Sequence, residues 1–254
     1  MARILAIANQ KGGVGKTTTT VNLVAALART KRRVLLVDLD PQGNATMGLG
    51  VDKDTVENSI TNVLLDEMPA KQAVQHLEQH GFWMLPDNAD LTAAEVGLVD
   101  VIAREQVLNR ALAELADDFD YILIDCPPAL NLLTLNALAA ADGVLVPMQC
   151  EYYAMEGLAA LLDTIEKIRN ALNNRLQIEG ILRTMHDPRN NLSNDVSEQL
   201  VAHFGEKVFR TQIPRNVRLA EAPSHGLPII EYDRASKGAQ AYLALAGELL
   251  RRAA

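Results

Sequence analysis

The sequence predicts an α/β fold: a doubly wound, mostly parallel sheet that is flanked by helices on both faces. Short apolar runs alternate along the chain with segments whose apolar residues recur at helical spacing, which is typical of repeated strand and helix units. A glycine-rich loop also separates the first apolar run from the first helical pattern. Since 254 residues with 48% apolar side chains can bury a full core, we expect one domain over residues 1–254.

Each element follows from its own pattern. Continuous apolar runs that stop at polar residues are typical of buried parallel strands. They predict strands at Ile4–Asn9, Val34–Asp38, Tyr121–Asp125, Gly143–Pro147, Gln177–Arg183 and Val208–Ile213. Helical spacing predicts helices at Lys16–Arg29, Val101–Ala116, Leu132–Ala140, Met155–Leu172, Asn194–Phe204 and Ser236–Arg252. Patterning is weaker over residues 52–90, where we expect a short helical insertion.

The glycine-rich loop, Gln10 to Thr18, predicts a phosphate-binding site. Its glycines and the helix that follows direct backbone N–H groups toward an anion. Lys16 would reach the outer phosphates of ATP, and the Thr17 hydroxyl would ligate Mg²⁺. Gln10 stands where the usual P-loop pattern has glycine, and Lys11 is an additional lysine. The residues that we expect around the nucleotide are Lys11, Gly12, Gly13, Val14, Gly15, Lys16, Thr17 and Thr18.

This loop resembles the deviant Walker motif (KGGxGKT) of the ParA/MinD family of dimerising P-loop NTPases. The resemblance implies that Lys11 reaches across a dimer to the nucleotide of the partner subunit. Two facing loops would leave no space for a side chain at Gly12. The alternative is that Gly12 only supplies a positive φ for the turn.

Acidic residues follow two of the predicted strands. Asp38 and Asp40 lie at the end of the second strand, and Asp125 ends the apolar run that starts at Tyr121. A carboxylate at a strand end beside a P-loop is how a Walker B motif faces a metal ion. We therefore expect Thr17, Asp40 and Asp125 at the Mg²⁺ ion. Asp38 either lies near the ion or holds the loop.

The resemblance extends along nearly the whole chain, through Asp38 to Asn44, Asp125 to Pro128 and the late segment Ile213 to Gly226. It is a resemblance to short chromosomal ParA (Soj) partition ATPases. It implies an ATP-bound homodimer, non-specific binding of double-stranded DNA, and ATP hydrolysis that a ParB-like partner stimulates. It also implies that Pro214 and Asn216 lie near the base. Arg183 departs from the family, which usually has an apolar residue there.

Phosphoryl transfer to water depends on positioning and on positive charge, because the protein does little covalent chemistry. Lys16 would supply charge from one subunit and Lys11 from the other. Asp40 is the candidate for orienting the attacking water, so the catalytic candidates are Lys11, Lys16 and Asp40. With no other obvious base, hydrolysis should be slow without a partner.

Charge alone favours a solvated surface over DNA binding. The chain has a net charge of −8, and residues 183–219 hold six basic and four acidic residues. The resemblance matches Arg189 and Arg218 to family arginines that bind DNA. No acidic residue lies between Arg215 and Glu221, so we expect the charge of Arg218 to be unneutralised. With 4% aromatic residues, contacts should be to phosphates rather than to bases.

Composition and the remaining motifs bear on location and on alternatives. No 18-residue apolar stretch occurs, and Cys126 and Cys150 offer no disulfide framework, so we expect a cytoplasmic protein without a membrane partner. The DNA binding that the resemblance implies would associate it with the nucleoid. We interpret both cysteines as core residues rather than iron–sulfur ligands. A MinD-like membrane ATPase would need a basic, bulky amphipathic helix at the C-terminus. A nucleotide-gated scaffold for a non-DNA cargo also stays open.

Overall fold

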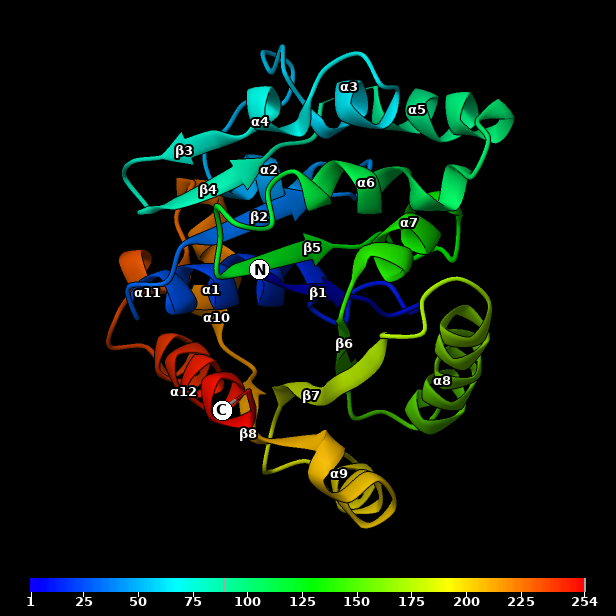
Figure 1. Ribbon diagram of the computed structural model, residues 1–254. Helices are drawn as coiled ribbons and strands as arrows, with labels where there is room; N and C mark the ends of the chain where they lie inside the picture. Colours follow the sequence, from blue (N-terminus) through cyan, green and yellow to red (C-terminus); the bar gives the residue numbers. More distant parts are fainter. Residues whose placement is uncertain (89, 254) are drawn as a thin grey trace.

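Eight strands form one sheet in the order β3-β4-β2-β5-β1-β6-β7-β8 in the computed structural model, which describes residues 1–88 and 90–253. Neighbouring strands are parallel, except that β3 and β4 are antiparallel (Figure 1). The strands are β1 (Arg3–Ile7), β2 (Val34–Asp38), β3 (Gln75–Leu77), β4 (Phe82–Leu85), β5 (Tyr121–Asp125), β6 (Gly143–Gln149), β7 (Gln177–His186) and β8 (Val208–Pro214).

Helices cover both faces of this sheet (Figure 1). They are α1 (Lys16–Ala28), α2 (Asn44–Gly48), α3 (Ile60–Leu64), α4 (Ala70–Ala73), α5 (Leu91–Gly97), α6 (Val107–Ala113), α7 (Leu132–Ala140), α8 (Ala154–Ala171), α9 (Asn191–Phe204), α10 (Val217–Glu221), α11 (Ile229–Tyr232) and α12 (Lys237–Arg252). Short 3-10 turns occupy Leu98–Asp100, Arg104–Gln106, Gly205–Lys207 and Ala222–His225. None of the described helices combines the length and apolar composition that a membrane span needs.

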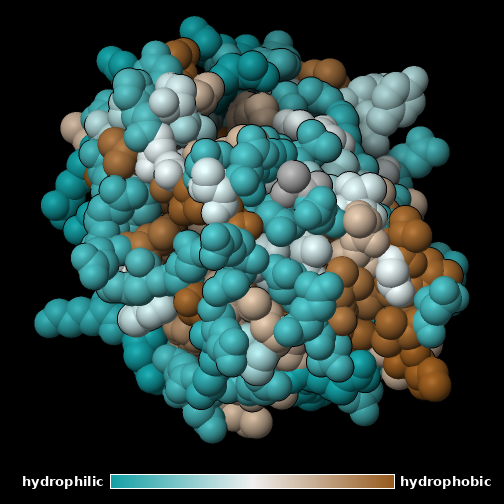
Figure 2. All heavy atoms as spheres, turned by 90° about the horizontal axis from the view of Figure 1, so that it is seen from above, coloured by the Kyte–Doolittle hydropathy of each residue, from teal (hydrophilic) through white to brown (hydrophobic). Residues whose placement is uncertain are grey.

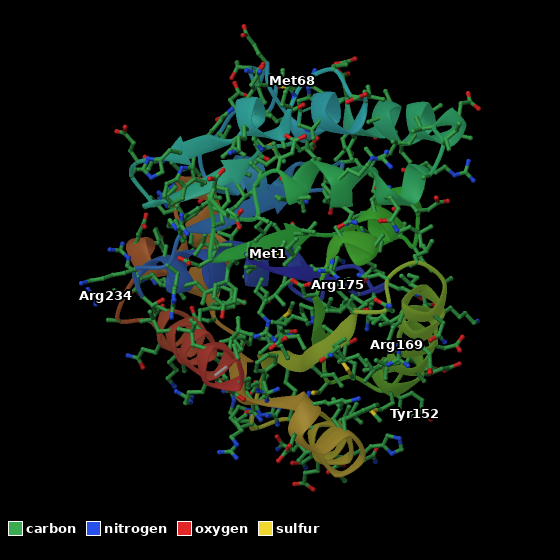
Figure 3. The ribbon with its side chains drawn as sticks, in the orientation of Figure 1. Met1, Met68, Tyr152, Arg169, Arg175 and Arg234 are labelled. Carbon is green, nitrogen blue, oxygen red and sulfur yellow. The ribbon has the colours of Figure 1, made fainter. Side chains whose placement is uncertain are left out.

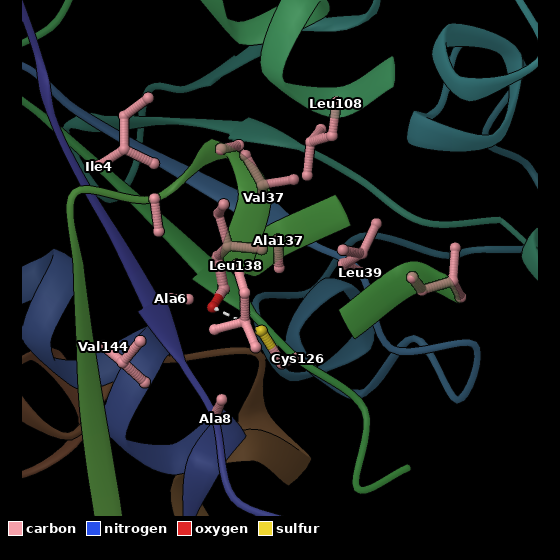
Figure 4. Close-up of a cluster of buried hydrophobic side chains, with 14 of the residues drawn as sticks. Ile4, Ala6, Ala8, Val37, Leu39, Leu108, Cys126, Ala137, Leu138 and Val144 are labelled. Atoms are coloured by element: carbon pink, nitrogen blue, oxygen red, sulfur yellow. Dashed lines mark hydrogen bonds between the residues drawn. The ribbon is translucent and has the colours of Figure 1, made fainter. Parts of the chain in front are cut away.

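The central strand β1 shows why the sheet is doubly covered. Its side chains alternate between two cores, because successive residues of a strand point to opposite faces. Ile4 and Ala6 pack into the core that contains α7, whereas Leu5 and Ile7 pack into the core that contains α1. Figure 4 shows the first of these cores with Cys126 inside it. The interpretation of Cys126 and Cys150 as buried core residues is confirmed.

The doubly wound fold class and all six predicted strands are confirmed, with ends that differ by up to a few residues. The helix predicted over 101–116 is too long. Only Val107–Ala113 is α-helical, behind a 3-10 turn, because Ala103 adopts φ 53°. A left-handed residue interrupts a right-handed helix. Ile102 is consequently 91% exposed.

The prediction of a short helical insertion over residues 52–90 is wrong in part. The segment holds α3 and α4, and it also supplies β3 and β4. Strand β4 pairs in parallel with β2, and β3 returns beside β4 after a turn at Gly81, which has φ 72°. Strands of three and four residues are too short to show a period of two.

Edge strand β8 contains a bulge that two charged side chains support. Between the pairs Ile181–Val208 and Arg183–Gln212, β8 advances further along the chain than β7 does. The Arg183 guanidinium donates hydrogen bonds to the carbonyl oxygens of Phe209 (2.7 Å) and Arg210 (3.3 Å). From α12, Glu248 accepts from the backbone N–H groups of Arg210 (2.8 Å) and Thr211 (2.9 Å). Arg183 thus substitutes for missing ladder donors, and Glu248 for missing acceptors.

We predict that Glu248→Ala destabilises the fold by about 1–3 kcal/mol, because it leaves two partly buried backbone donors and the Arg252 guanidinium without their acceptor. Urea unfolding, followed by circular dichroism, measures this change. The exposed ion-pair residue Glu166, replaced by alanine, is the control and should cost under about 1 kcal/mol. Equal unfolding midpoints for the two variants would show that the bulge needs no support from α12.

Candidate nucleotide-binding and catalytic site

The predicted site residues lie at one edge of the sheet. Because the strands are parallel, the loops that follow β1, β2, β5, β7 and β8 all leave at their carboxyl ends. The strand register pairs Ile7 with Asp125 and Asp38 with Asp125. The glycine-rich loop after β1 therefore lies near the acidic ends of β2 and β5, and it leads into the start of α1.

The glycine-rich loop has the backbone of an anion cradle. Gly13 and Gly15 adopt φ 72° and 87°, and Gly15 caps the start of α1. These left-handed conformations suit glycine alone without strain. The Thr184 hydroxyl donates to the carbonyl oxygen of Val14 at 2.8 Å, so β7 anchors the loop. The helix N-terminus and its free N–H groups then face the space in front of the loop.

Lys16 lies inside the loop, next to the acidic strand ends. It is 7% exposed, and its Nζ donates to the Lys11 carbonyl oxygen at 3.3 Å. Burial lowers the pKa of Lys16, while the negative charges of Asp125 and Asp40 oppose that shift. A buried ammonium group held by a backbone carbonyl is positioned to meet a phosphate.

Asp125 and the hydroxyl groups near it fit a magnesium site. Asp125 is fully buried, and its Oδ1 accepts from the Thr20 hydroxyl at 3.0 Å. Burial raises the pKa of Asp125 well above its usual range, the Asp38 charge adds to this, and hydrogen bonds from Thr17 and Thr20 lower it. Within residues 1–88 and 90–253 its Oδ2 has no hydrogen-bond partner. An unpartnered buried carboxylate oxygen beside a threonine hydroxyl is the oxygen donor set that Mg²⁺ prefers.

Asp38 and Asp40 differ in how many hydrogen bonds their carboxylates accept. Asp38 Oδ2 accepts from the backbone N–H (2.8 Å) and the hydroxyl (2.7 Å) of Thr46, and its Oδ1 accepts from the Asp40 N–H. Of the two alternatives for Asp38, these contacts favour the one in which it holds the loop. Asp40 Oδ1 accepts from the Gln42 N–H at 3.1 Å, and the side chain is 7% exposed. Asp40 keeps more freedom to meet a water molecule.

The sequence analysis missed Asp87, a fourth acid at this edge. Asp87 is fully buried after β4, and neither of its carboxylate oxygens has a hydrogen-bond partner among the described residues. Burial raises its pKa to about 8, and the neighbouring Asp38 charge contributes. The signal was present, because Asp87 follows the apolar run that starts at Phe82, as Asp125 follows its strand.

A pocket for a flat apolar group adjoins the phosphate loop. It has a volume of about 340 Å³, and Gly15, Thr184, Met185, Ile213 and Tyr242 contribute to its lining. The pocket also contains Pro214 and Asn216, which were predicted near the base. Asn216 Oδ1 accepts from the Arg218 N–H at 2.8 Å and caps α10. A nucleoside can therefore lie here while its phosphates enter the loop.

Lys11 lies on the rim of the loop, unlike Lys16. Its side chain is 50% exposed, and its Nζ forms an ion pair with Glu151, which follows β6. Glu151 was missed because sequence spacing does not indicate which strand ends are neighbours. The two aromatic residues that follow it, Tyr152 and Tyr153, are 73% and 72% exposed. Figure 3 labels Tyr152 near the start of α8.

The expectation that nothing neutralises Arg218 is wrong. Arg218 pairs with Glu221 (2.7 Å) and lies 3.7 Å from Asp233. The first acid is one helical turn away on α10, and the second comes from a distant loop. Arg189 likewise pairs with Asp187 at 2.8 Å. Both arginines are exposed, but any phosphate must compete with these carboxylates.

Comparison with known proteins places these features in a family. A family model described as an AAA domain matches residues 2–178. The sporulation initiation inhibitor protein Soj of Bacillus subtilis is 53% identical over 249 residues, which cover 98% of both chains. The chromosome partitioning protein ParA of Myxococcus xanthus is 53% identical over 99% of this chain and 89% of its own.

A solved structure agrees in fold and in overall length. The crystal structure of cobyrinic acid a,c-diamide synthase from Mycobacterium smegmatis with bound ADP and magnesium has a TM-score of 0.86 and 44% identity, covering 99% of this chain and 95% of that one. Family model, sequence relatives and structure agree on a nucleotide-binding fold over nearly the whole chain. The chain therefore belongs to the ParA/Soj family of chromosome-partitioning ATPases.

Proposed function

We propose that this ATPase segregates DNA. ATP and Mg²⁺ bind at the glycine-rich loop, and two copies then associate through this edge of the sheet. The dimer binds double-stranded DNA without sequence preference and is thereby associated with the nucleoid. A ParB-like protein stimulates hydrolysis, which releases the dimer.

The observation that carries this proposal is the separation of the two lysines. Lys16 is 7% exposed inside the loop, whereas the Lys11 side chain is 50% exposed on the rim and is held by Glu151. One loop therefore presents one ammonium group to its own phosphates and a second to the exterior. A second copy that faces the rim would receive Lys11, after the pair with Glu151 has opened.

The surface around the rim supports association. Large apolar side chains are exposed in loops at the same sheet edge, with Leu130 42%, Tyr152 73% and Tyr153 72% exposed. Gly12 supports it as well, since a Cβ atom built at Gly12 would meet no atom within 4 Å in the single chain. Gly12 is also absent from the described glycines with positive φ. Among the residues that the structure describes, neither a steric clash nor a positive φ requires a glycine there, whereas a facing loop would.

The residues divide the chemistry of hydrolysis among them. Lys16 and the loop N–H groups bind the phosphates, and Thr17, Asp40 and Asp125 would hold the magnesium ion, which neutralises charge on the phosphate oxygens when bound. Asp40 orients the attacking water, and Lys11 of the partner subunit stabilises the charge that develops on the leaving phosphates. The mycobacterial relative binds ADP and magnesium, which supports this use of the site.

A positioning ATPase for a membrane or another non-DNA cargo is the alternative. The terminal helix α12 argues against a membrane helix, because Tyr242, Leu245 and Leu249 are buried in the core beside α1. Stimulation of ATP turnover by DNA would favour partition over a scaffold for another cargo. The name of the mycobacterial relative suggests an amidation reaction for that protein. Cys126 offers no nucleophile for such a reaction in this chain, because burial raises the pKa of its thiol and disfavours the thiolate.

Asp40→Ala should lower ATP turnover by at least about 100-fold, because the attacking water loses its acceptor. ATP-dependent dimerisation should persist, since the phosphate contacts do not involve this carboxylate. Phosphate release and light scattering measure the two properties. Asp54→Ala, an exposed acid of the following loop, is the control. A monomeric Asp40→Ala protein in saturating ATP would contradict the assignment.

Gly12→Val should bind ATP with nearly normal affinity and stay monomeric, because the branched side chain occupies the space of the facing loop. Calorimetry and light scattering distinguish the two effects. Gly12→Ala should weaken the dimer less, in proportion to its smaller side chain. Normal dimerisation of both variants would mean that no second loop approaches Gly12.

Arg218→Ala should weaken DNA binding by the ATP-bound dimer. The slope of log binding constant against log salt concentration should become shallower by about two, since each dimer loses two phosphate contacts. Arg189→Ala should act in the same direction but more moderately. Glu221→Gln should strengthen binding, because it releases Arg218 from its internal partner. Arg169→Ala on α8 is the control. Unchanged affinity across a salt titration of the Arg218 variant would exclude this surface.

A further inference from the structure

A basic cleft lies beside the edge strand β8, away from the nucleotide site. It has a volume of about 910 Å³, and it is bounded by the C-terminal ends of α9 and α12 and by the first residues of β8. Figure 1 shows α9 and α12 on either side of β8, near the C-terminus. Since β8 enters the sheet at Val208, the cleft faces the amino ends of the strands, away from the glycine-rich loop.

Four arginines and two glutamates line this cleft. Glu248 is already satisfied, since it accepts from the backbone of β8 and from Arg252 at 2.9 Å. Arg252 in turn lies over the Phe209 ring, with its Cζ 4.1 Å from the ring centre. These two residues therefore neutralise each other and form the wall of the cleft.

The other arginines have no acidic partner. Within the described parts of the chain, Arg183, Arg210 and Arg251 form no ion pair. Glu206 is the one remaining acid among the lining residues. The cleft therefore has an excess of positive charge in a protein whose net charge is −8.

Arg183 adds an observation that is independent of charge counting. It is 6% exposed, and its terminal nitrogens are used by Ser197, Phe209 and Arg210. Its Nε has no hydrogen-bond partner among residues 1–88 and 90–253. A buried guanidinium group whose N–H groups are not all paired is costly, and because Nε is itself buried, an anion in the cleft would stabilise Arg183 through its charge rather than by a hydrogen bond to Nε.

We propose that this cleft binds a phosphorylated anion. Guanidinium groups match the geometry of phosphate oxygens, and the volume is much larger than one phosphate needs. Since Arg210 and Arg251 can each bind one phosphate, the ligand that fits them both is an anion with more than one phosphate group, which is either a free polyphosphate or pyrophosphate compound or the backbone of a nucleic acid. Arg210 and Arg251 bind its phosphates, and Arg183 contributes from the wall.

Pyrophosphate is the probe, titrated by calorimetry into a Lys16→Ala protein, in which competition from the glycine-rich loop is weakened by the loss of its buried lysine. Arg210→Gln combined with Arg251→Gln should weaken pyrophosphate binding by about tenfold or more, because two charged hydrogen bonds are lost. Glu206→Gln should strengthen binding. Both arginines are exposed, so these variants should melt at the parental temperature, and Arg110→Gln is the matched control.

The same variants in the wild-type background distinguish the source of the phosphate. Weaker retention of a DNA duplex in the presence of ATP identifies a nucleic-acid backbone, whereas unchanged retention together with lost pyrophosphate binding identifies a free compound. Pyrophosphate binding that the double substitution and Glu206→Gln both leave unchanged would overturn the proposal. Absence of binding to the Lys16→Ala protein at millimolar pyrophosphate would overturn it as well.

Discussion

The site depends on an excess of buried negative charge at the carboxyl ends of β2, β4 and β5. Asp38, Asp40, Asp87 and Asp125 are each at most 7% exposed, and Lys16 is the buried cation beside them. Burial raises the pKa of Asp38 to about 6 and that of Asp87 to about 8, which shows the cost of keeping these groups ionised. A divalent cation at Asp125 would relieve this cost, so the chain is built to bind its nucleotide together with magnesium.

Contacts from several other elements hold this site together around the glycine-rich loop. Thr184 from β7 anchors the loop, Asp38 fixes the start of α2 through Thr46, and α12 supports the β8 bulge that leads to the pocket beside the loop. Because Lys16 is buried inside the loop, Lys11 on the rim is the lysine that can reach a second subunit in the proposed dimer. The exterior is mainly hydrophilic, as Figure 2 shows for one face, where the largest group of apolar side chains lies at the lower right and smaller ones are scattered elsewhere. Val96 and Ile102, of the segment after α5, are 70% and 91% exposed.

The sequence pattern predicted the features that depend on residues close together in the chain. The apolar runs of β1, β2 and β5 and the glycine-rich loop were predictable, because burial and positive φ leave direct traces in residue type. The edge strands β3 and β4 were not, since their pairing partner lies elsewhere in the chain. The same holds for side-chain partners: Asp233 beside Arg218, Glu151 beside Lys11 and Glu248 under the β8 bulge are neighbours only after folding. Sequence alone therefore predicted which groups are charged but not which are neutralised.

The most direct test of the charge argument is the thermal stability of the protein with ATP, measured once with magnesium and once with a chelator. Stabilisation by a ligand follows its affinity for the folded state. Magnesium with ATP should raise the melting temperature by several degrees, whereas ATP with chelator should have little effect, because its phosphates then meet unneutralised carboxylates. Equal stabilisation under the two conditions would contradict the claim that the acidic strand ends require a cation.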